Sequence, residues 1–178
     1  KTRPANAHFD GQQGILRLSD LVDLLRAVDR PIVLVAELKH STYFDSIGLP
    51  LEPRFARDIA AWEKPDNLIV ESFQQTALAR IQELDVLGRV TMLVEAAGAP
   101  ADQVAQFGDR ARSYSDYLTD AGLARLAAEV DGVSVDKALV LRSRADSSVF
   151  ETTDLVARAH SAGLETYVWT LRAENRFL

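Results

Sequence analysis

The sequence predicts an α/β fold built on a parallel sheet, and three observations carry this prediction. Short apolar runs recur along the chain, and each is followed by a segment in which apolar residues have helical spacing. The runs are near-continuous rather than alternating, which is typical of strands buried on both faces of a parallel sheet. Five such units fit into the 178 residues. A complete (β/α)8 TIM barrel needs about 250 residues, so we predict an incomplete barrel, with a doubly wound sheet as the alternative that the pattern leaves open.

The strands and helices are expected to follow one another in regular order. Strands are predicted at residues 32–39, 68–73, 89–95, 132–136 and 165–170, because each segment is apolar and is bounded by turn residues or charges. Helices are predicted where apolar residues recur three or four positions apart: from Ser19 to Val28, from Phe55 to Trp62, from Ala77 to Leu84, from Thr119 or Asp120 to Val130, and from Thr152 or Thr153 to Gly163.

Two stretches show no clean period and are expected to be irregular. Residues 41–51 are predicted as a loop with Gly48 and Pro50 as turn residues. Residues 96–118 are small and polar, and they are predicted as a long loop or excursion. The whole chain, 1–178, is expected to form one partial barrel domain.

The composition limits the classes of protein to which the chain can belong. Its net charge is −6 and it has no basic stripe, so nucleic acid is not expected as a partner. No apolar run approaches the roughly 20 residues that span a bilayer, so no transmembrane segment is expected. The absence of cysteine excludes disulfides, zinc–thiolate sites and cysteine nucleophiles. The chain starts at Lys1 and stops at Leu178 without a polar tail, so we expect truncation at both ends.

Charged residues appear at the end of the first predicted strand. Side chains alternate along a strand, so Val35, Glu37 and Lys39 share one face. That face becomes charged only at its C-terminal end, where α/β barrels place their active sites. A carboxylate there is a hard oxygen ligand for calcium or magnesium, and an ammonium two residues further on can bind a phosphate oxygen. The alternative is a structural ion pair between Glu37 and Lys39.

The second predicted strand repeats this arrangement. Glu71 and Phe73 share a face, and an unpaired carboxylate is costly among the helices. Glu71 is therefore expected to face the barrel interior, as a partner of Lys39 or as a second metal ligand, and the partner role is favoured. Phe73 is expected to form an apolar wall. Glu95 ends the third strand, and a structural or surface role is expected for it.

Aromatic residues and histidines are the remaining candidates. Tyr167 and Trp169 share one face of the last strand, where core packing and a ligand platform both stay open. His160 is expected near a helix C-terminus, where a cation is favourable, and His8 is expected on the surface. His40 is expected to be a loop residue, with substrate contact as the alternative. None of the three is expected to be a general acid or base.

Four segments, in this order and spread over nearly the whole chain, resemble strand motifs of glycerophosphodiester phosphodiesterases. They are Ala-Glu-Leu-Lys-His at 36–40, Val-Glu-Ser-Phe-Gln at 70–74, Asp-Gly-Val-Ser-Val-Asp-Lys at 131–137, and the stretch from Ala159 to Leu178. The ending Thr-x-Arg-x-Glu-x-x-Phe-Leu and the loop after Lys39 resemble the secreted and periplasmic branch of the family. A secreted or periplasmic location is therefore expected, with a cytoplasmic one as the alternative.

The resemblance implies hydrolysis of a small-molecule glycerophosphodiester to glycerol 3-phosphate and an alcohol. It also implies a divalent metal, with Ca²⁺ favoured over Mg²⁺, held by three carboxylates of which Glu37 matches the third. Lys39 matches a lysine that holds the phosphate, and Phe73 and Trp169 match positions on the glycerol side of the pocket. Arg172, in the turn after the last strand, is a further candidate for substrate binding.

The resemblance further implies that the proton-transfer residues are not in this sequence. In the family, the general acid and base are histidines of early His-Arg-Gly and His-Asp motifs, and a Glu-x-Asp motif supplies the other metal ligands. These motifs and the final Thr-Asp strand are missing, so this chain alone is expected to be inactive. Two other functions are retained as alternatives: a non-catalytic phosphodiester-binding or interaction protein, and a barrel aldolase with a Schiff base at Lys39.

Overall fold

The computed structural model describes residues 8–12, 14–143 and 150–171. Its main element is a five-stranded sheet with the order β1-β2-β3-β4-β7, in which all neighbouring strands are parallel. The strands are β1 (Leu34–Glu37), β2 (Leu68–Ser72), β3 (Arg89–Val94), β4 (Gly132–Asp136) and β7 (Glu165–Trp169). The prediction of five parallel strands is confirmed, and each lies within two residues of its predicted ends.

The strand order decides between the two architectures that the sequence left open. Within this sheet, strands that follow one another in the chain are also neighbours in space, so the strand order never reverses. Crossovers between parallel strands are right-handed in nearly all proteins, and an unreversed order therefore puts every connecting helix on the same side. A doubly wound sheet needs a reversal. The fold is thus an incomplete (β/α)8 barrel.

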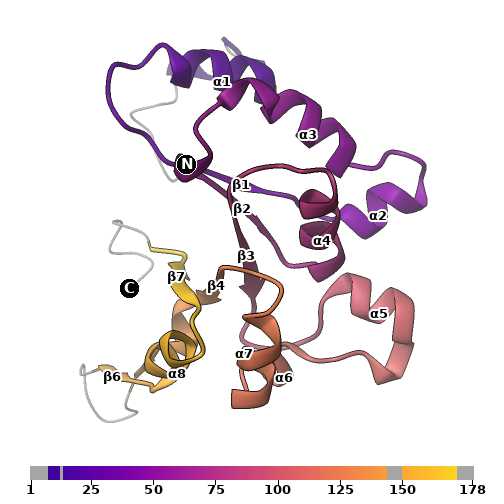
Figure 1. Cartoon of the computed structure of the whole chain (residues 1–178), viewed down its shortest axis with the longest axis vertical. Helices are drawn as coiled ribbons and strands as arrows, with labels where there is room; N and C mark the ends of the chain where they lie inside the picture. The colour runs from indigo at the N-terminus through magenta and orange to yellow at the C-terminus, as the bar shows by residue number, and fades with distance from the viewer. Residues whose placement is uncertain (1–7, 13, 144–149, 172–178) are drawn as a thin grey trace.

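The helices follow the convex side of this curved sheet, as Figure 1 shows. Helix α1 precedes β1, and the others connect successive strands. The five that flank the sheet are α1 (Leu18–Arg26), α3 (Glu52–Ile59), α4 (Gln75–Glu83), α7 (Asp120–Leu126) and α8 (Leu155–Ser161). A single turn of 3-10 helix, Ala60–Trp62, extends α3.

The hydrophobic core lies between the sheet and these helices. Alternate residues of each strand face the helices, and those of β2 and β3 are almost fully buried, among them Val70 and Met92. The other face of the sheet is the concave side. At β1 this side is open, since Val33 and Val35 are each about half exposed (50% and 52%).

The two stretches predicted as irregular contain short helices, so that prediction is wrong in part. Residues 41–51 include α2 (Ser41–Ser46), and residues 96–118 include α5 (Ala101–Phe107) and α6 (Tyr114–Tyr117). These helices are too short to show a period of apolar residues. Helix α6 instead begins with a capping box. The Ser113 side chain accepts a hydrogen bond from the Asp116 amide, and the Asp116 side chain accepts one from the Ser113 amide.

The predicted helix ends are partly confirmed. The Thr119 hydroxyl accepts a hydrogen bond from the Gly122 amide at 3.0 Å and caps α7. Gly163 follows α8 with φ of +89°, as its predicted place after the helix requires. However, α1 begins at Leu18, one residue before the predicted cap, and α8 begins at Leu155.

A small antiparallel pair was not expected from the sequence. Strands β5 (Leu141–Ser143) and β6 (Phe150–Thr152) pair between β4 and α8. Within the part of the chain that the structure describes, we find no helix with the length and apolar character needed to cross a membrane.

Candidate active site

The chemically informative side chains gather on the concave face, at the C-terminal edge of the sheet. In the parallel register, Glu37 of β1 stands opposite Glu71 of β2. Strand alternation puts the following residues on the same face: Lys39, Phe73, Glu95, Ser134, Asp136, Tyr167 and Trp169. The expectation that Glu71 faces the barrel interior agrees with this register.

Glu37 and Glu71 form a pair of neighbouring carboxylates. Burial raises the pKa of Glu71, and the negative charge of Glu37 raises it further, whereas a hydrogen bond with Ser134 and the charge of Lys39 act in the opposite direction. Two carboxylates on one face repel each other, and a nearby cation stabilises such a pair. The pair therefore offers two oxygen donors to a positive charge.

Lys39 provides part of this positive charge, but it contacts Glu37 and not Glu71, the partner expected from the sequence. Its ammonium lies 3.0 Å from a carboxylate oxygen of Glu37, on its own strand. The favoured ion pair with Glu71 is therefore wrong, and Glu71 senses Lys39 only as a nearby charge. The reason is geometric, because Glu37 and Lys39 are next neighbours on one face of the strand. The side chain of Lys39 is 60% exposed and can reach a ligand.

Backbone contacts position the end of β1. The buried Ser72 hydroxyl donates a hydrogen bond to the carbonyl of Leu38 at 2.8 Å, and the Leu38 amide donates to the carbonyl of Glu71 at 2.8 Å. The side chain of Gln74 accepts from the Thr42 amide at 2.8 Å. These bonds hold the residues on either side of Lys39 against β2.

An aromatic cluster lies next to these charged residues. The rings of Phe73 and Trp169 meet edge to face, with centroids 5.6 Å apart. The indole N–H of Trp169 donates to the carbonyl of Ser134 at 3.1 Å, which fixes the ring over β4. The structure thus brings together Phe73 and Trp169, although about a hundred residues separate them in the chain.

Tyr114 completes the cluster, and the sequence did not single it out. Its ring lies 6.3 Å from that of Phe73, again edge to face. Tyr114 is the first residue of α6. Its amide donates to the carbonyl of Gly98 at 2.9 Å, which holds the start of α6 next to the loop that follows β3. Burial and then the charge of Glu95 raise the pKa of Tyr114. The local signal that was available was the capping sequence from Ser113 to Asp116.

A cavity of about 330 Å³ opens between the loops that follow β1, β2 and β3. Lys39, His40, Phe73, Glu95 and Tyr114 contribute to its lining. The cavity therefore adjoins the strand-end lysine on one side and the aromatic cluster on the other.

Of the remaining predicted residues, His40 lies at the edge of this site, His160 and His8 lie away from it, and Arg172 cannot be placed. His40 is exposed at the start of α2, with a left-handed backbone (φ +60°), and it lines the cavity. His160 lies exposed in the last turn of α8, and His8 is exposed near the start. Arg172 lies outside the described residues. Among residues that the structure describes, no cluster of three or more histidine, aspartate or glutamate side chains could hold a metal.

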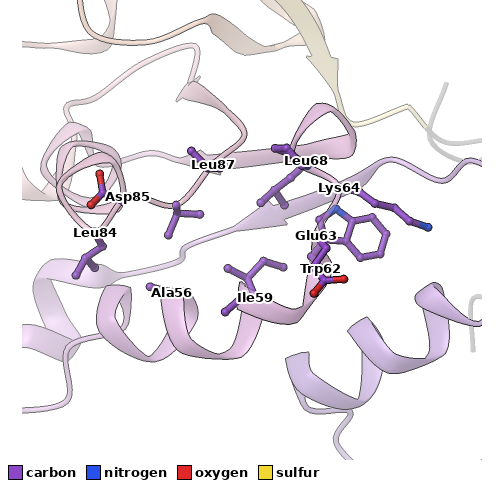
Figure 2. A pocket seen from close by; sticks show the side chains of 12 residues that line it. Ala56, Ile59, Trp62, Glu63, Lys64, Leu68, Leu84, Asp85 and Leu87 are labelled. Carbon is purple, nitrogen blue, oxygen red and sulfur yellow. The ribbon is translucent and has the colours of Figure 1, made fainter.

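A second cavity of about 320 Å³ lies away from these groups (Figure 2). Figure 2 shows Trp62, Ile59 and Leu68 lining it between the end of α3 and the start of β2, with Lys64 at one side. Its walls come from the helix layer and from the N-terminal end of β2. Active sites of α/β barrels lie at the opposite edge, so this cavity is not the candidate active site.

Comparisons with known proteins indicate the family to which the chain belongs. The sequence profile of the glycerophosphoryl diester phosphodiesterase family matches residues 50–177. The chain is similar to glycerophosphodiester phosphodiesterase GDPD6 of Arabidopsis thaliana, with 23% identity over 192 residues that cover 96% of this chain and 48% of that protein.

The fold is similar to a solved structure from Silicibacter pomeroyi DSS-3, provisionally assigned as a glycerophosphoryl diester phosphodiesterase. The TM-score is 0.58 at 19% identity, over 95% of this chain and 52% of that one. The chain thus spans about half the length of both relatives. Since the profile match extends from the residues before α3 to beyond β7, more than half of the chain, the chain belongs to the glycerophosphoryl diester phosphodiesterase family.

Proposed function

We propose that the protein hydrolyses glycerophosphodiesters to glycerol 3-phosphate and an alcohol, with the help of a divalent metal ion. One observation carries the proposal: two carboxylates and a lysine lie beside an aromatic wall at the C-terminal edge of a parallel barrel sheet. A phosphodiester needs a positive charge for its phosphate and an apolar wall for its carbon chain. The match to the family profile begins after Lys39, so the roles of Glu37 and Lys39 rest on this geometry and on the motif around them.

Glu37 would hold the metal, with Glu71 as a second oxygen donor. The raised pKa of Glu71 fits this role, because a dication beside the pair would relieve both the burial of its charge and its repulsion by Glu37. We favour Ca²⁺ over Mg²⁺. Calcium takes about 6–8 oxygen ligands, so two carboxylates are only part of its shell. When bound, the metal would neutralise the charge on the phosphate.

The other residues would bind and orient the substrate. Lys39 would donate to a non-bridging phosphate oxygen, in addition to its contact with Glu37. Phe73 and Trp169 would form the wall against the glycerol carbons, since their rings already pack together. We assign the proton transfers to histidines of the early family motifs, and none of the described histidines takes that role.

The test is metal-dependent turnover by the protein at its natural length. The protein is treated with EDTA, and glycerol 3-phosphate released from glycerophosphocholine is measured before and after addition of calcium or magnesium. Release should require the metal, and calcium should restore it best. Glu37→Gln should lower the restored rate by about 10²–10³-fold, as loss of an electrostatic stabiliser does. Glu83→Gln is the matched control, because Glu83 is exposed at the far end of α4.

The same experiment separates the alternatives. Binding of glycerophosphocholine without any release would support a non-catalytic phosphodiester-binding protein. An aldolase would need the Lys39 amine free to attack a carbonyl carbon, whereas this nitrogen lies in an ion pair with Glu37 at 3.0 Å. For the location of the protein we propose secretion or a periplasmic site, which fractionation of the native host would test.

A further inference from the structure

We propose that the cavity beside Lys39 is a subsite for the alcohol part of the substrate, and that it selects alcohols carrying an ammonium group. The inference rests on the proposed phosphodiester function, whose phosphate it places at Lys39. Three features carry it: the position of the cavity, a carboxylate in its wall that forms no ion pair with any described residue, and aromatic rings beside that carboxylate.

The position of the cavity suits the part of a phosphodiester that is not glycerol. Lys39 lines the cavity and is also the proposed phosphate ligand, so a phosphate held there has one ester arm at the cavity mouth. Phe73 stands between the two sides, with Trp169 at 5.6 Å and Tyr114 at 6.3 Å. The Trp169 side is assigned to glycerol. The Tyr114 side, which belongs to the cavity, is left for the alcohol.

The charge in the cavity wall favours a cation. Glu95 follows β3 on the concave face, is exposed, and lines the cavity. In the part of the chain covered by the structure, none of the ion pairs found involves Glu95. Lys39 lines the same cavity but pairs with Glu37 at 3.0 Å, and Arg158, which shares another cavity with Glu95, pairs with Asp120 and Asp154. A ligand ammonium would therefore give Glu95 the opposite charge that it lacks.

The rings beside Glu95 add a second recognition element. Tyr114 is close enough to Glu95 for the carboxylate charge to raise its pKa. Tyr114 and Phe73 meet edge to face at an interplanar angle of 76°, and both line the cavity, where the largely buried Tyr114 (5% exposed) forms part of the inner wall. Aromatic faces attract quaternary ammonium groups through cation–π interactions. A carboxylate beside two such rings is the chemistry that recognises choline-like alcohols.

An anionic alcohol is the competing possibility, because Lys39 and His40 also line the cavity. However, Lys39 already pairs with Glu37 and is assigned to the substrate phosphate. His40 is exposed at the edge of the cavity. A second anion in the cavity would face Glu95 at close range. The balance of charge therefore favours the cationic alcohol, and the experiment includes the anionic one.

The experiment compares two substrates of the same shape and different charge. One is glycerophosphocholine, and the other is its 3,3-dimethylbutyl analogue, in which carbon replaces the nitrogen. The ratio of kcat/KM for the two isolates the effect of the ammonium charge from size and hydrophobicity. For the natural-length protein this ratio should be about tenfold or more, as expected for a cation held by a carboxylate and aromatic rings.

Glu95→Gln should lower this ratio about tenfold, because it removes the charge and keeps the shape. Glu83→Gln makes the same change at an exposed site beyond the cavity and should leave the ratio as it is. Tyr114→Phe should retain the ratio and Tyr114→Leu should lower it, since only the second loses the ring. Glu95 is exposed, so its substitution is not expected to disturb folding.

Each outcome supports or overturns the inference. A ratio near one in the parent protein, or an equal ratio in Glu95→Gln, would overturn it. Higher activity on the glycerophosphodiester of glycolate, whose alcohol carries a carboxylate and no ammonium group, than on glycerophosphocholine in the parent would favour the anionic alternative. If neither substrate is hydrolysed, binding of choline measured by calorimetry decides. Binding that weakens in Glu95→Gln keeps the subsite and refutes the phosphodiesterase function, and absence of binding refutes both.

Discussion

Replacing Gly122 by alanine should destabilise the protein, although alanine is the better helix former. Gly122 is buried in α7, where the helix meets the end of α6. A Cβ atom at this position would come within 2.1 Å of the carbonyl oxygen of Asp116 and 2.6 Å of that of Tyr117. Both are backbone atoms, so no side-chain rotation can relieve the contact, and α6 would have to move.

The magnitude follows from two opposing terms. Alanine in place of glycine in a helix gains about 1 kcal/mol. Forcing an extra group into packed structure costs about 1–3 kcal/mol, and a 2.1 Å contact with the backbone belongs at the upper end of that range. The net loss is therefore about 2 kcal/mol. In urea unfolding, this loss should lower the midpoint of the transition without changing its slope m.

The assay is reversible unfolding of the natural-length protein, followed by circular dichroism in urea and on heating. Ala124→Gly is the control, because Ala124 is exposed on the same helix and reports helix propensity alone, with an expected loss of about 1 kcal/mol. Because α6 carries Tyr114, Gly122→Ala should also weaken the preference for an ammonium alcohol. A variant as stable as the parent, or more stable, would refute the packing argument.

Three further predictions follow from the charged residues. Lys39→Met should lower kcat/KM for glycerophosphodiesters by about 10²-fold through loss of a phosphate contact, and Lys39→Arg should recover part of it; equal activity of both variants with the parent would contradict this role. The pKa of Glu71 is raised on folding, so the folded state binds more protons than the unfolded state. The parent therefore loses stability as pH rises from about 4.5 through the raised pKa. Glu71→Gln in EDTA should therefore show a smaller fall in Tm between pH 4 and pH 7, and parallel curves would contradict it. Calcium should raise the Tm of the parent by mass action and raise that of Glu37→Gln less, as measured by differential scanning calorimetry.

Much of the sheet could be predicted because a buried parallel strand leaves a local signal. The apolar run of each strand is contained in a few consecutive residues, and alternation assigns its two faces. This is why Glu37 and Lys39 could be placed together before the structure was known, and why Glu71 could be directed inward. The short helices α2, α5 and α6 left no such signal, since each is about one or two turns long and begins at a cap or a turn.

The sequence by itself determined the parallel strands, their order of appearance and the charged C-terminal end of β1, because these properties depend on residues close together in the chain. Only the tertiary structure decided that the strand order never reverses, that Lys39 pairs with Glu37 rather than Glu71, and that Tyr114 joins Phe73 and Trp169. These features depend on contacts between residues far apart in the chain or on competition between nearby partners. No local pattern of apolar and polar residues records the outcome of such a competition.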